Sequence, residues 1–165
     1  MTLLIDADWL IYSSCCACEQ DIQWDSNLHT LHADERDVHE MVDGRVAHYQ
    51  TIAEGDKNVV MCFTEYPTFR HTIYPEYKAN RKHKRKPLGL RKIIEGVKER
   101  YTSESYPGLE GDDVMSILAT SKKYSDSIVV SVELFAKFCL MIAFSKLFKF
   151  LLFLISFKFL FFISS

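Results

Sequence analysis

Residues 108–119 read GLEGDDVMSILA, and they place three carboxylates directly before an apolar helical pattern. The carboxylates belong to Glu110, Asp112 and Asp113. In the residues that follow, apolar side chains recur at intervals of three and four, the spacing of one face of a helix. Acidic groups are favourable in a first helical turn because they meet the positive end of the helix dipole. The cluster alone is therefore equally consistent with simple capping and with a ligand site.

A fourth carboxylate stands near the amino terminus. Residues 3–5 form a short apolar run typical of a buried strand, and Asp6 follows where that strand should end. The carboxyl end of a strand in an open α/β sheet faces the crevice in which such sheets bind ligands. We therefore expect Asp6 to meet the helix-start cluster at one sheet edge. Asp8 could join that site or cap the following helix, and we favour the cap.

A basic segment, residues 74–87, lies between these two carboxylate regions and reads YPEYKANRKHKRKP. From Arg81 to Lys86 five of six positions are basic, with His83 as the sixth. Such a run is most often a solvated loop or a general patch for polyanions. The formal net charge of the chain is only −2, so its charges are segregated. Because carboxylates attract divalent cations and basic side chains attract phosphates, the combination predicts a site that cleaves phosphodiesters.

Three motifs, in this order, resemble the 5′-nuclease family. They are LLIDADWLIY at residues 3–12, FR with PEYKANRK within residues 69–82, and LEGDDV at residues 109–114, followed by a strand pattern, SIVVSV. This family comprises phage 5′–3′ exonucleases and flap endonucleases and the related domain of bacterial DNA polymerase I. The resemblance implies an α/β fold, a PIN-like (resolvase-like) three-layer domain with a mainly parallel central sheet, here truncated.

The resemblance also implies roles for individual residues. The metal ligands would be Asp6, Glu110, Asp112 and Asp113, holding two Mg²⁺ ions, with Mn²⁺ as a substitute. Lys78 and Arg81 match the basic pair that the family directs at the scissile phosphate, where they would stabilise the charge that develops on its oxygens. A metal-bound water would be the nucleophile, because coordination lowers its pKa.

DNA binding by the basic segment should depend on the structure of the DNA more than on its sequence. Contacts to phosphates position DNA without reading its bases, and an aromatic ring adds base stacking worth roughly 1–3 kcal/mol. The DNA-binding candidates are Tyr77, Lys78, Arg81, Lys82, Lys84, Arg85 and Lys86. The expected partner is DNA with a 5′ end or with a junction between single and double strands.

Two positions depart from the family pattern. Where many relatives carry an acidic residue after the second strand, this chain has Thr64, with Glu65 beside it. After the strand pattern at residues 127–132 the family pattern has Asp-x-Asp, whereas this chain continues with Glu133 and then Leu-Phe. Glu133 is a candidate metal ligand, but Phe135 offers none. The second metal cluster is therefore incomplete, and this puts the activity of the chain in question.

The composition changes abruptly at residue 134. Residues 134–165 contain only four charged side chains, all Lys, among mostly Phe, Leu and Ile. A membrane span needs about 20 mostly apolar residues, whereas the longest uncharged run here is eight residues. We interpret the segment as a low-complexity tail created by a frameshift or truncation, in preference to a membrane anchor or a packed element. The chain thus divides into a nuclease-like domain, 1–133, and this tail.

Between the motifs, the patterns predict further elements. We expect a helix at residues 9–19, a hairpin or extended excursion at 22–31, a strand at 58–63 and a helix after Gly89. Before that strand, Asp34 can cap a long helix that ends at Gly55, in which apolar residues from Val38 onward recur at intervals of three and four. Three cysteines within residues 15–18 lack the paired spacing of zinc sites, so we expect them in a helix packed on the sheet.

The main functional hypothesis is a metal-dependent 5′–3′ exonuclease or flap endonuclease that hydrolyses DNA. The alternatives are a DNA-binding remnant without catalysis and a PIN-type ribonuclease. Salt-sensitive DNA binding without cleavage would favour the remnant, and a preference for single-stranded RNA would favour the ribonuclease. No secretory signal is visible, because the apolar amino terminus carries Asp6 and Asp8. We therefore expect the protein in the cytoplasm, or in the host cytoplasm if a phage encodes it. We expect no membrane contact.

The frameshift interpretation predicts a specific pattern in the coding DNA. A shift of one or two nucleotides near codon 133 should restore an Asp-x-Asp reading and remove the apolar tail. Sequencing the gene and its downstream DNA checks this directly. A downstream sequence with no such reading in either alternative frame would show that the tail belongs to the gene as it stands.

Overall fold

The computed structural model describes residues 1–55, 57–81 and 83–131. By the contacts between its residues, the chain divides into two compact units, Met1–Ser131 and Val132–Ser165. Only the first unit lies within the described residues. Lys82, Glu133 and the apolar tail, for which the sequence made predictions, lie outside them.

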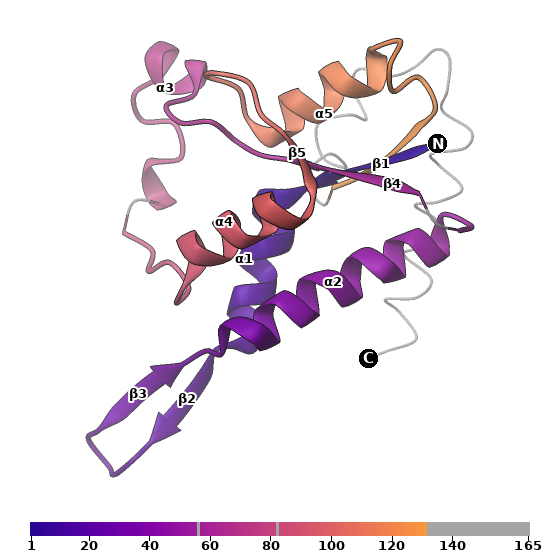
Figure 1. Ribbon diagram of the computed structural model, residues 1–165. Coiled ribbons are helices and arrows are strands. Elements are labelled where there is room, and N and C mark those ends of the chain that lie inside the picture. The colour runs from indigo at the N-terminus through magenta and orange to yellow at the C-terminus, as the bar shows by residue number, and fades with distance from the viewer. Residues whose placement is uncertain (56, 82, 132–165) are drawn as a thin grey trace, which may run out of the picture. The chain divides into compact units, whose positions relative to one another are not determined.

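A four-stranded parallel sheet forms the centre of the first unit, with the strand order β5-β4-β1-β6 (Figure 1). The strands are β1 (Thr2–Asp6), β4 (Asn58–Cys62), β5 (Thr102–Glu104) and β6 (Ser127–Val130). In the register of the sheet, Asp6 is paired with Cys62 and Cys62 with Glu104. Because all four strands run the same way, their carboxyl ends form one edge. The predicted α/β fold with a mainly parallel sheet is confirmed.

Helices cover both faces of the sheet (Figure 1). They are α1 (Ala7–Cys18), α2 (Glu35–Ile52), α3 (Phe69–Ile73), α4 (Leu90–Arg100) and α5 (Gly111–Thr120). Helices α1, α2 and α4 pack on one another below the sheet, while α5 packs on β1, β4 and β6 from the other side. This is the three-layer arrangement that the sequence predicted.

Strand β1 forms the middle of the core. Leu3, Leu4 and Ile5 are all fully buried, as expected of a central parallel strand that helices cover on both faces. The apolar face of α2 contributes side chains at the predicted helical spacing, beginning with Val38. Cys15 is buried on α1, as expected of a packed helix.

The helix caps agree with the sequence analysis at one site and differ at another. Asp34 caps α2, accepting a hydrogen bond from the backbone N–H of Arg36 at 2.8 Å, as predicted. The prediction that Asp8 caps α1 is wrong, because β1 runs directly into α1 and makes Asp6 the capping residue. The Asp6 carboxylate accepts from the N–H of Trp9 at 3.2 Å. Asp8 is left in the first turn, where its side chain can reach the sheet edge.

The predicted hairpin is present as a separate two-stranded sheet, β2 (Gln20–Gln23) with β3 (His29–His32), which projects from the end of α1 and α2 (Figure 1). Two short elements were not predicted: helix α3 and the edge strand β5. A 3₁₀ turn, η1 (Ala79–Arg81), also interrupts the basic segment. In the described part of the chain, no helix combines the length and apolar character needed to span a bilayer.

The burial of β1 makes a stability prediction. Replacing Ile5, which is fully buried, with Ala should lower the free energy of unfolding by about 2–5 kcal/mol, because the change removes buried methyl groups and leaves a cavity. Ile117, which is 46% exposed on α5, is the matched control. Ile117→Ala should change stability by no more than about 0.5 kcal/mol. Urea denaturation measures both, and equal losses would contradict the assigned core.

Candidate functional site

The candidate site lies where the amino terminus of α5 meets the carboxyl edge of the sheet. The backbone N–H of Gly111, the first residue of α5, donates to the Thr64 hydroxyl at 3.0 Å. A Cβ added to Gly111 would lie 3.2 Å from the Cys62 carbonyl oxygen, 3.7 Å from Asp6 Oδ1 and 3.8 Å from Asp8 Oδ2. A glycine at this position therefore lets α5 approach both carboxylates and the strand end closely.

Glu110 is the most deeply buried acid of the cluster, only 4% exposed. Lys78 donates to its Oε1 at 3.0 Å, and the hydroxyl of Tyr77 donates to its Oε2 at 3.1 Å. Arg70 Nη1 lies 3.6 Å from the same Oε2. A buried carboxylate requires such partners, because an unpaired charge in the interior is costly. The basic segment is thereby held against the site by two consecutive residues.

Asp113 is bound by both ends of one guanidinium. Arg70 Nη1 donates to Asp113 Oδ2 at 2.5 Å, and Nη2 donates to Oδ1 at 2.8 Å. These hydrogen bonds to Asp113 raise the pKa of Arg70 above its usual value, although burial of the guanidinium opposes them. Asp113 Oδ2 also accepts from the backbone N–H of Glu110 at 3.1 Å, which closes the first turn of α5. Arg70 was not among the predicted site residues, although the FR motif that contains it was part of the resemblance.

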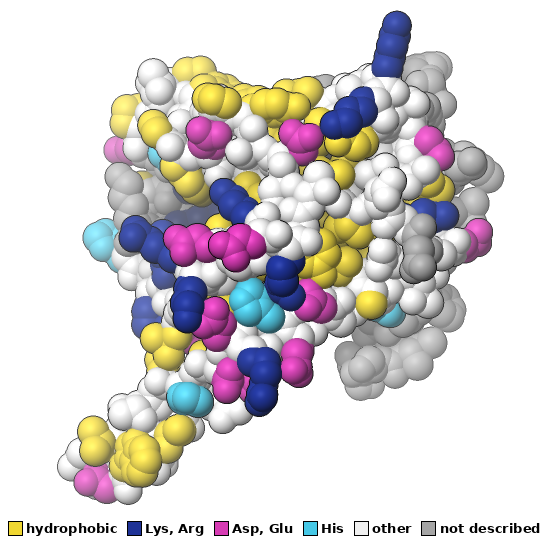
Figure 2. All heavy atoms as spheres, viewed as in Figure 1, with side chains coloured by type: hydrophobic (Ala, Val, Ile, Leu, Met, Phe, Trp, Pro, Cys, Tyr) yellow, Lys and Arg dark blue, Asp and Glu magenta, His cyan; other side chains and the backbone are white. Residues whose placement is uncertain are grey.

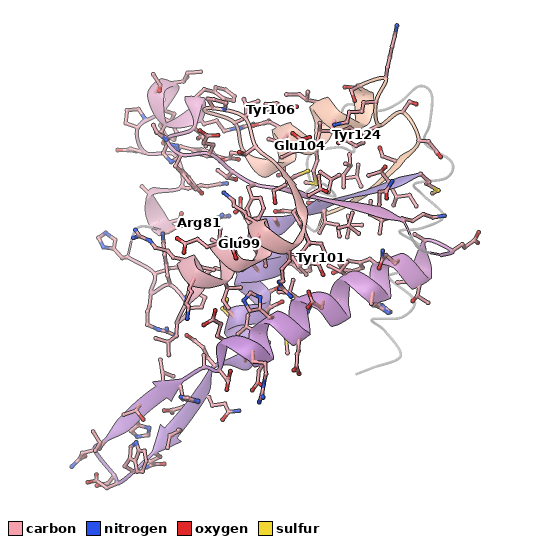
Figure 3. The ribbon with its side chains drawn as sticks, viewed as in Figure 1. Arg81, Glu99, Tyr101, Glu104, Tyr106 and Tyr124 are labelled. Atoms are coloured by element: carbon pink, nitrogen blue, oxygen red, sulfur yellow. The ribbon has the colours of Figure 1, made fainter. Side chains whose placement is uncertain are left out.

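The remaining acids of the edge point in other directions. Asp8 Oδ2 accepts from the backbone N–H of Thr64 at 2.8 Å, and burial raises the pKa of Asp8 in spite of this bond. Asp112 lies toward the end of β6, where the Ser131 hydroxyl is 3.4 Å from its Oδ1. Glu104 ends β5 at the same edge, but its carboxylate lies beside the Tyr124 hydroxyl, 3.5 Å away (Figure 3).

Thr64 and Glu65, which stand in place of the acidic residue of many relatives, have structural roles here. Thr64 links Asp8 to the start of α5 through its N–H and its hydroxyl. Glu65 is exposed and accepts from the Ser105 hydroxyl at 3.3 Å. Thr64 thus helps to hold the site together, whereas the sequence had marked it only as a departure from the family pattern.

The acids of the cluster have the right ligand atoms for a divalent cation, but their arrangement in space does not form a site for one. Carboxylate oxygens are the ligands that Mg²⁺ prefers. In the described residues, however, no three His, Cys, Asp or Glu side chains are grouped so that they could hold a metal ion together. Of the predicted ligands, Glu110 and Asp113 are engaged by Lys78 and Arg70. The structure thus brings the predicted acids to one edge but does not assemble them into a metal centre.

The basic segment crosses from the site toward the far end of α1. Lys78 has a left-handed backbone conformation, with φ of 55°, which turns its side chain into the cluster. Burial opposes the charge of Lys78, but the hydrogen bond and the charge of Glu110 outweigh it, so the pKa of Lys78 is raised. Arg81 lies in η1, at the left of the molecule in Figure 3. Figure 2 shows that dark blue basic side chains and magenta acidic ones alternate on this face.

Arg85, a predicted DNA-binding residue, is already bound to an acid. Its Nη1 and Nη2 donate to the two carboxylate oxygens of Glu19, at 2.8 and 2.5 Å. Glu19 is the C-cap residue that follows α1. Tyr77 is likewise engaged, since its hydroxyl contacts Glu110 and its ring packs edge-on against His71, with centroids 5.5 Å apart. Lys84 and Lys86 are exposed.

Comparisons with known proteins find relatives of the chain by sequence. The sequence matches the family described as 5′-3′ exonuclease, N-terminal resolvase-like domain, over residues 1–133. It is similar to an exodeoxyribonuclease of Enterobacteria phage T3 and to an exonuclease of Escherichia phage T7. Each is 32% identical over 126 residues, which cover 72% of this chain and 41% of the relative. The chain thus spans about two-fifths of the length of these relatives. No solved structure matches the chain significantly.

The Arg70 pair gives a testable prediction. Arg70→Ala should lower the free energy of unfolding at neutral pH by about 1–3 kcal/mol, because it leaves two largely buried carboxylates without a shared cation. Arg36→Ala is the control, since Arg36 is 78% exposed and its nearest carboxylates are 3.9–4.0 Å away. The free energy of unfolding of Arg36→Ala should differ from that of the parent by no more than about 0.5 kcal/mol. An Arg70 variant as stable as the control would show that the pair is not formed in solution.

Proposed function

The chain belongs to the family of 5′-3′ exonuclease N-terminal, resolvase-like domains, and on this premise we propose that it is a nuclease domain that hydrolyses DNA phosphodiester bonds from a 5′ end or at a flap. The observation that carries the proposal is the meeting of two opposite kinds of charge at one sheet edge. Glu110 and Asp113, at the start of α5, lie beside cations from α3 and the basic segment, and Asp6 of β1 lies close to the same helix start. This combination suits a phosphodiester, which is an anion that must be held while a bond to phosphorus is broken.

Lys78 and Arg81 are the proposed phosphate-binding pair. Lys78 is 23% exposed, so its ammonium can be reached from solvent while Glu110 keeps it charged. Arg81 follows one turn later, in η1. Positive groups placed where charge develops on the phosphate oxygens stabilise the transition state more than the ground state. Arg70 holds Asp113 and thereby fixes the first turn of α5.

A divalent cation, Mg²⁺ with Mn²⁺ as a substitute, is the proposed cofactor, and two ions are expected by analogy with the family. Asp6, Glu110, Asp112 and Asp113 are the proposed ligands. When bound, such an ion would supply a water molecule of lowered pKa as the nucleophile. The chain's own residues would have to rearrange for this, because Lys78 and Arg70 bind two of these acids. The proposed setting is the cytoplasm, where the DNA substrate is found.

Cleavage assays test the proposal. A 5′-labelled duplex and a 5′-flap substrate are incubated with the full chain and Mg²⁺, with EDTA and Asp112→Ala as the two negative controls. We expect label release that requires Mg²⁺ and falls at least about 100-fold in the Asp112 variant. Asp126→Ala is the matched control, because Asp126 is 80% exposed and pairs only with the amino terminus at 3.5 Å in the described structure. Its activity should equal that of the parent.

The other outcomes separate the alternatives. Salt-sensitive DNA binding with no cleavage would identify a DNA-binding remnant and overturn the nuclease proposal. Faster cleavage of single-stranded RNA than of either DNA substrate would identify a ribonuclease. Release that is equal with EDTA, or equal in the Asp112 variant, would exclude the proposed metal site.

A further inference from the structure

We propose that Glu19 is a positioning residue for DNA binding, and that it acts by anchoring the far end of the basic segment through Arg85. The inference rests on the proposed function, since it concerns how the same site receives DNA. It assigns to Arg85 a structural role in place of the phosphate contact that the sequence predicted. It also gives a role to Glu19, which no motif had marked.

Three hydrogen bonds converge on the Glu19 carboxylate. Two come from the Arg85 guanidinium, at 2.8 and 2.5 Å, and the third comes from the backbone N–H of Leu88, at 2.7 Å. The donors lie 66 and 69 residues away along the sequence. The Glu19 side chain is only 10% exposed. A paired guanidinium and carboxylate with two parallel bonds has a defined geometry, unlike a single contact between mobile side chains.

The basic segment is therefore tied down at both ends. Tyr77 and Lys78 hold its first end to Glu110, beside the candidate site. Arg85 and Leu88 hold its second end to Glu19, just before α4 begins. Figure 1 shows the chain running down the left side of the molecule between these two points. With both ends fixed, the exposed cations between them are presented along one path.

Helix α1 sets the length of that path. It starts directly after Asp6, at the site, and ends at Cys18, directly before Glu19 at the anchor. Twelve helical residues rise about 18 Å. Successive phosphates of one strand rise about 3.4 Å along the duplex axis, so a helix of this length matches the axial rise of roughly five phosphates. The anchor would thus keep a row of positive charge aligned with a short stretch of the DNA backbone that leads to the site.

The anchor persists across the pH range used for nuclease assays. The hydrogen bonds from Arg85 come first among the causes that lower the pKa of Glu19, from 4.5 to about 2. A carboxylate whose pKa is lowered on folding stabilises the folded state fully when the pH is above its pKa in the unfolded chain, here 4.5. This stabilisation is lost as the pH falls toward 2, the pKa in the folded protein. The Glu19 carboxylate is therefore ionised at neutral pH, and its pairing with Arg85 contributes its full stabilisation there.

The effect of Glu19→Ala on DNA affinity distinguishes an anchoring role for Arg85 from a direct contact between Arg85 and phosphate. If Arg85 contacted phosphate, Glu19→Ala would free Arg85 and remove a negative charge, and DNA would bind more tightly. If Glu19 anchors the segment, the same change weakens DNA binding, because the cations must then be ordered when DNA binds. We expect Glu19→Ala to raise the Kd for the 5′-flap substrate about tenfold. Cleavage should show a raised KM with kcat within about twofold of the parent.

Three further variants complete the test. Arg85→Ala should weaken binding no more than Glu19→Ala does, because it keeps the Leu88 bond to Glu19. The double variant should bind no more weakly than Glu19→Ala, since Arg85 acts through Glu19. Arg85→Ala should also leave the slope of log Kd against log salt unchanged, whereas loss of a phosphate contact would lower it by about one. Glu40→Ala, which removes an exposed acid from α2, is the control and should not weaken binding.

Amide hydrogen exchange supplies a measurement that needs no DNA. The Leu88 N–H should be protected in the parent and should exchange at least about tenfold faster in Glu19→Ala. Tighter DNA binding by Glu19→Ala, or an unprotected Leu88 amide in a parent that binds DNA, would overturn the anchor alone. A parent that binds no DNA while Leu88 is protected would overturn the proposed function, and with it the role in DNA binding.

Discussion

The close contact between the first turn of α5 and the carboxyl edge of the sheet is the constraint on which the site depends. A Cβ at Gly111 would make a tight contact, 3.2 Å, with the Cys62 carbonyl oxygen, and the N–H of Gly111 is held by Thr64. A glycine in a first helical turn reduces helix propensity by up to about 1 kcal/mol relative to alanine. In return, the absence of a side chain at Gly111 lets the start of α5 approach Asp6 and Asp8 closely.

The second feature of the molecule is the way opposite charges are distributed over distant segments. The paired acids, Asp113 and Glu110, come from the start of α5, and the cations that bind them come from α3 and the basic segment. Each ion pair therefore links elements that the sheet alone would leave unconnected. The net charge of −2 conceals this arrangement, because the charges cancel over the whole chain but are separated along it.

The sequence predicted the parts of the fold that follow from local patterns. The apolar run of β1, the helical spacing of α2 and the cap at Asp34 are each determined by residues within one element, and each is confirmed. The capping role of Asp6 was missed, because α1 begins two residues earlier than the predicted helix, and helix boundaries are the least certain part of a local pattern. The partners of Arg70 and Arg85 were missed for a different reason. Which acid a cation finds depends on tertiary structure, and no local pattern contains it.

The pairing of Lys78 with Glu110 limits how a phosphate can enter the site. Glu110 is 4% exposed, so a phosphate that draws Lys78 away leaves a buried carboxylate short of positive charge. Uncompensated buried charge costs several kcal/mol, more than one phosphate contact returns. Tyr77 and Arg70 remain near Glu110, but Arg70 is already bound to Asp113. Phosphate binding by Lys78 should therefore be coupled to the arrival of another positive charge at Glu110, and under the proposed function that charge is the divalent cation.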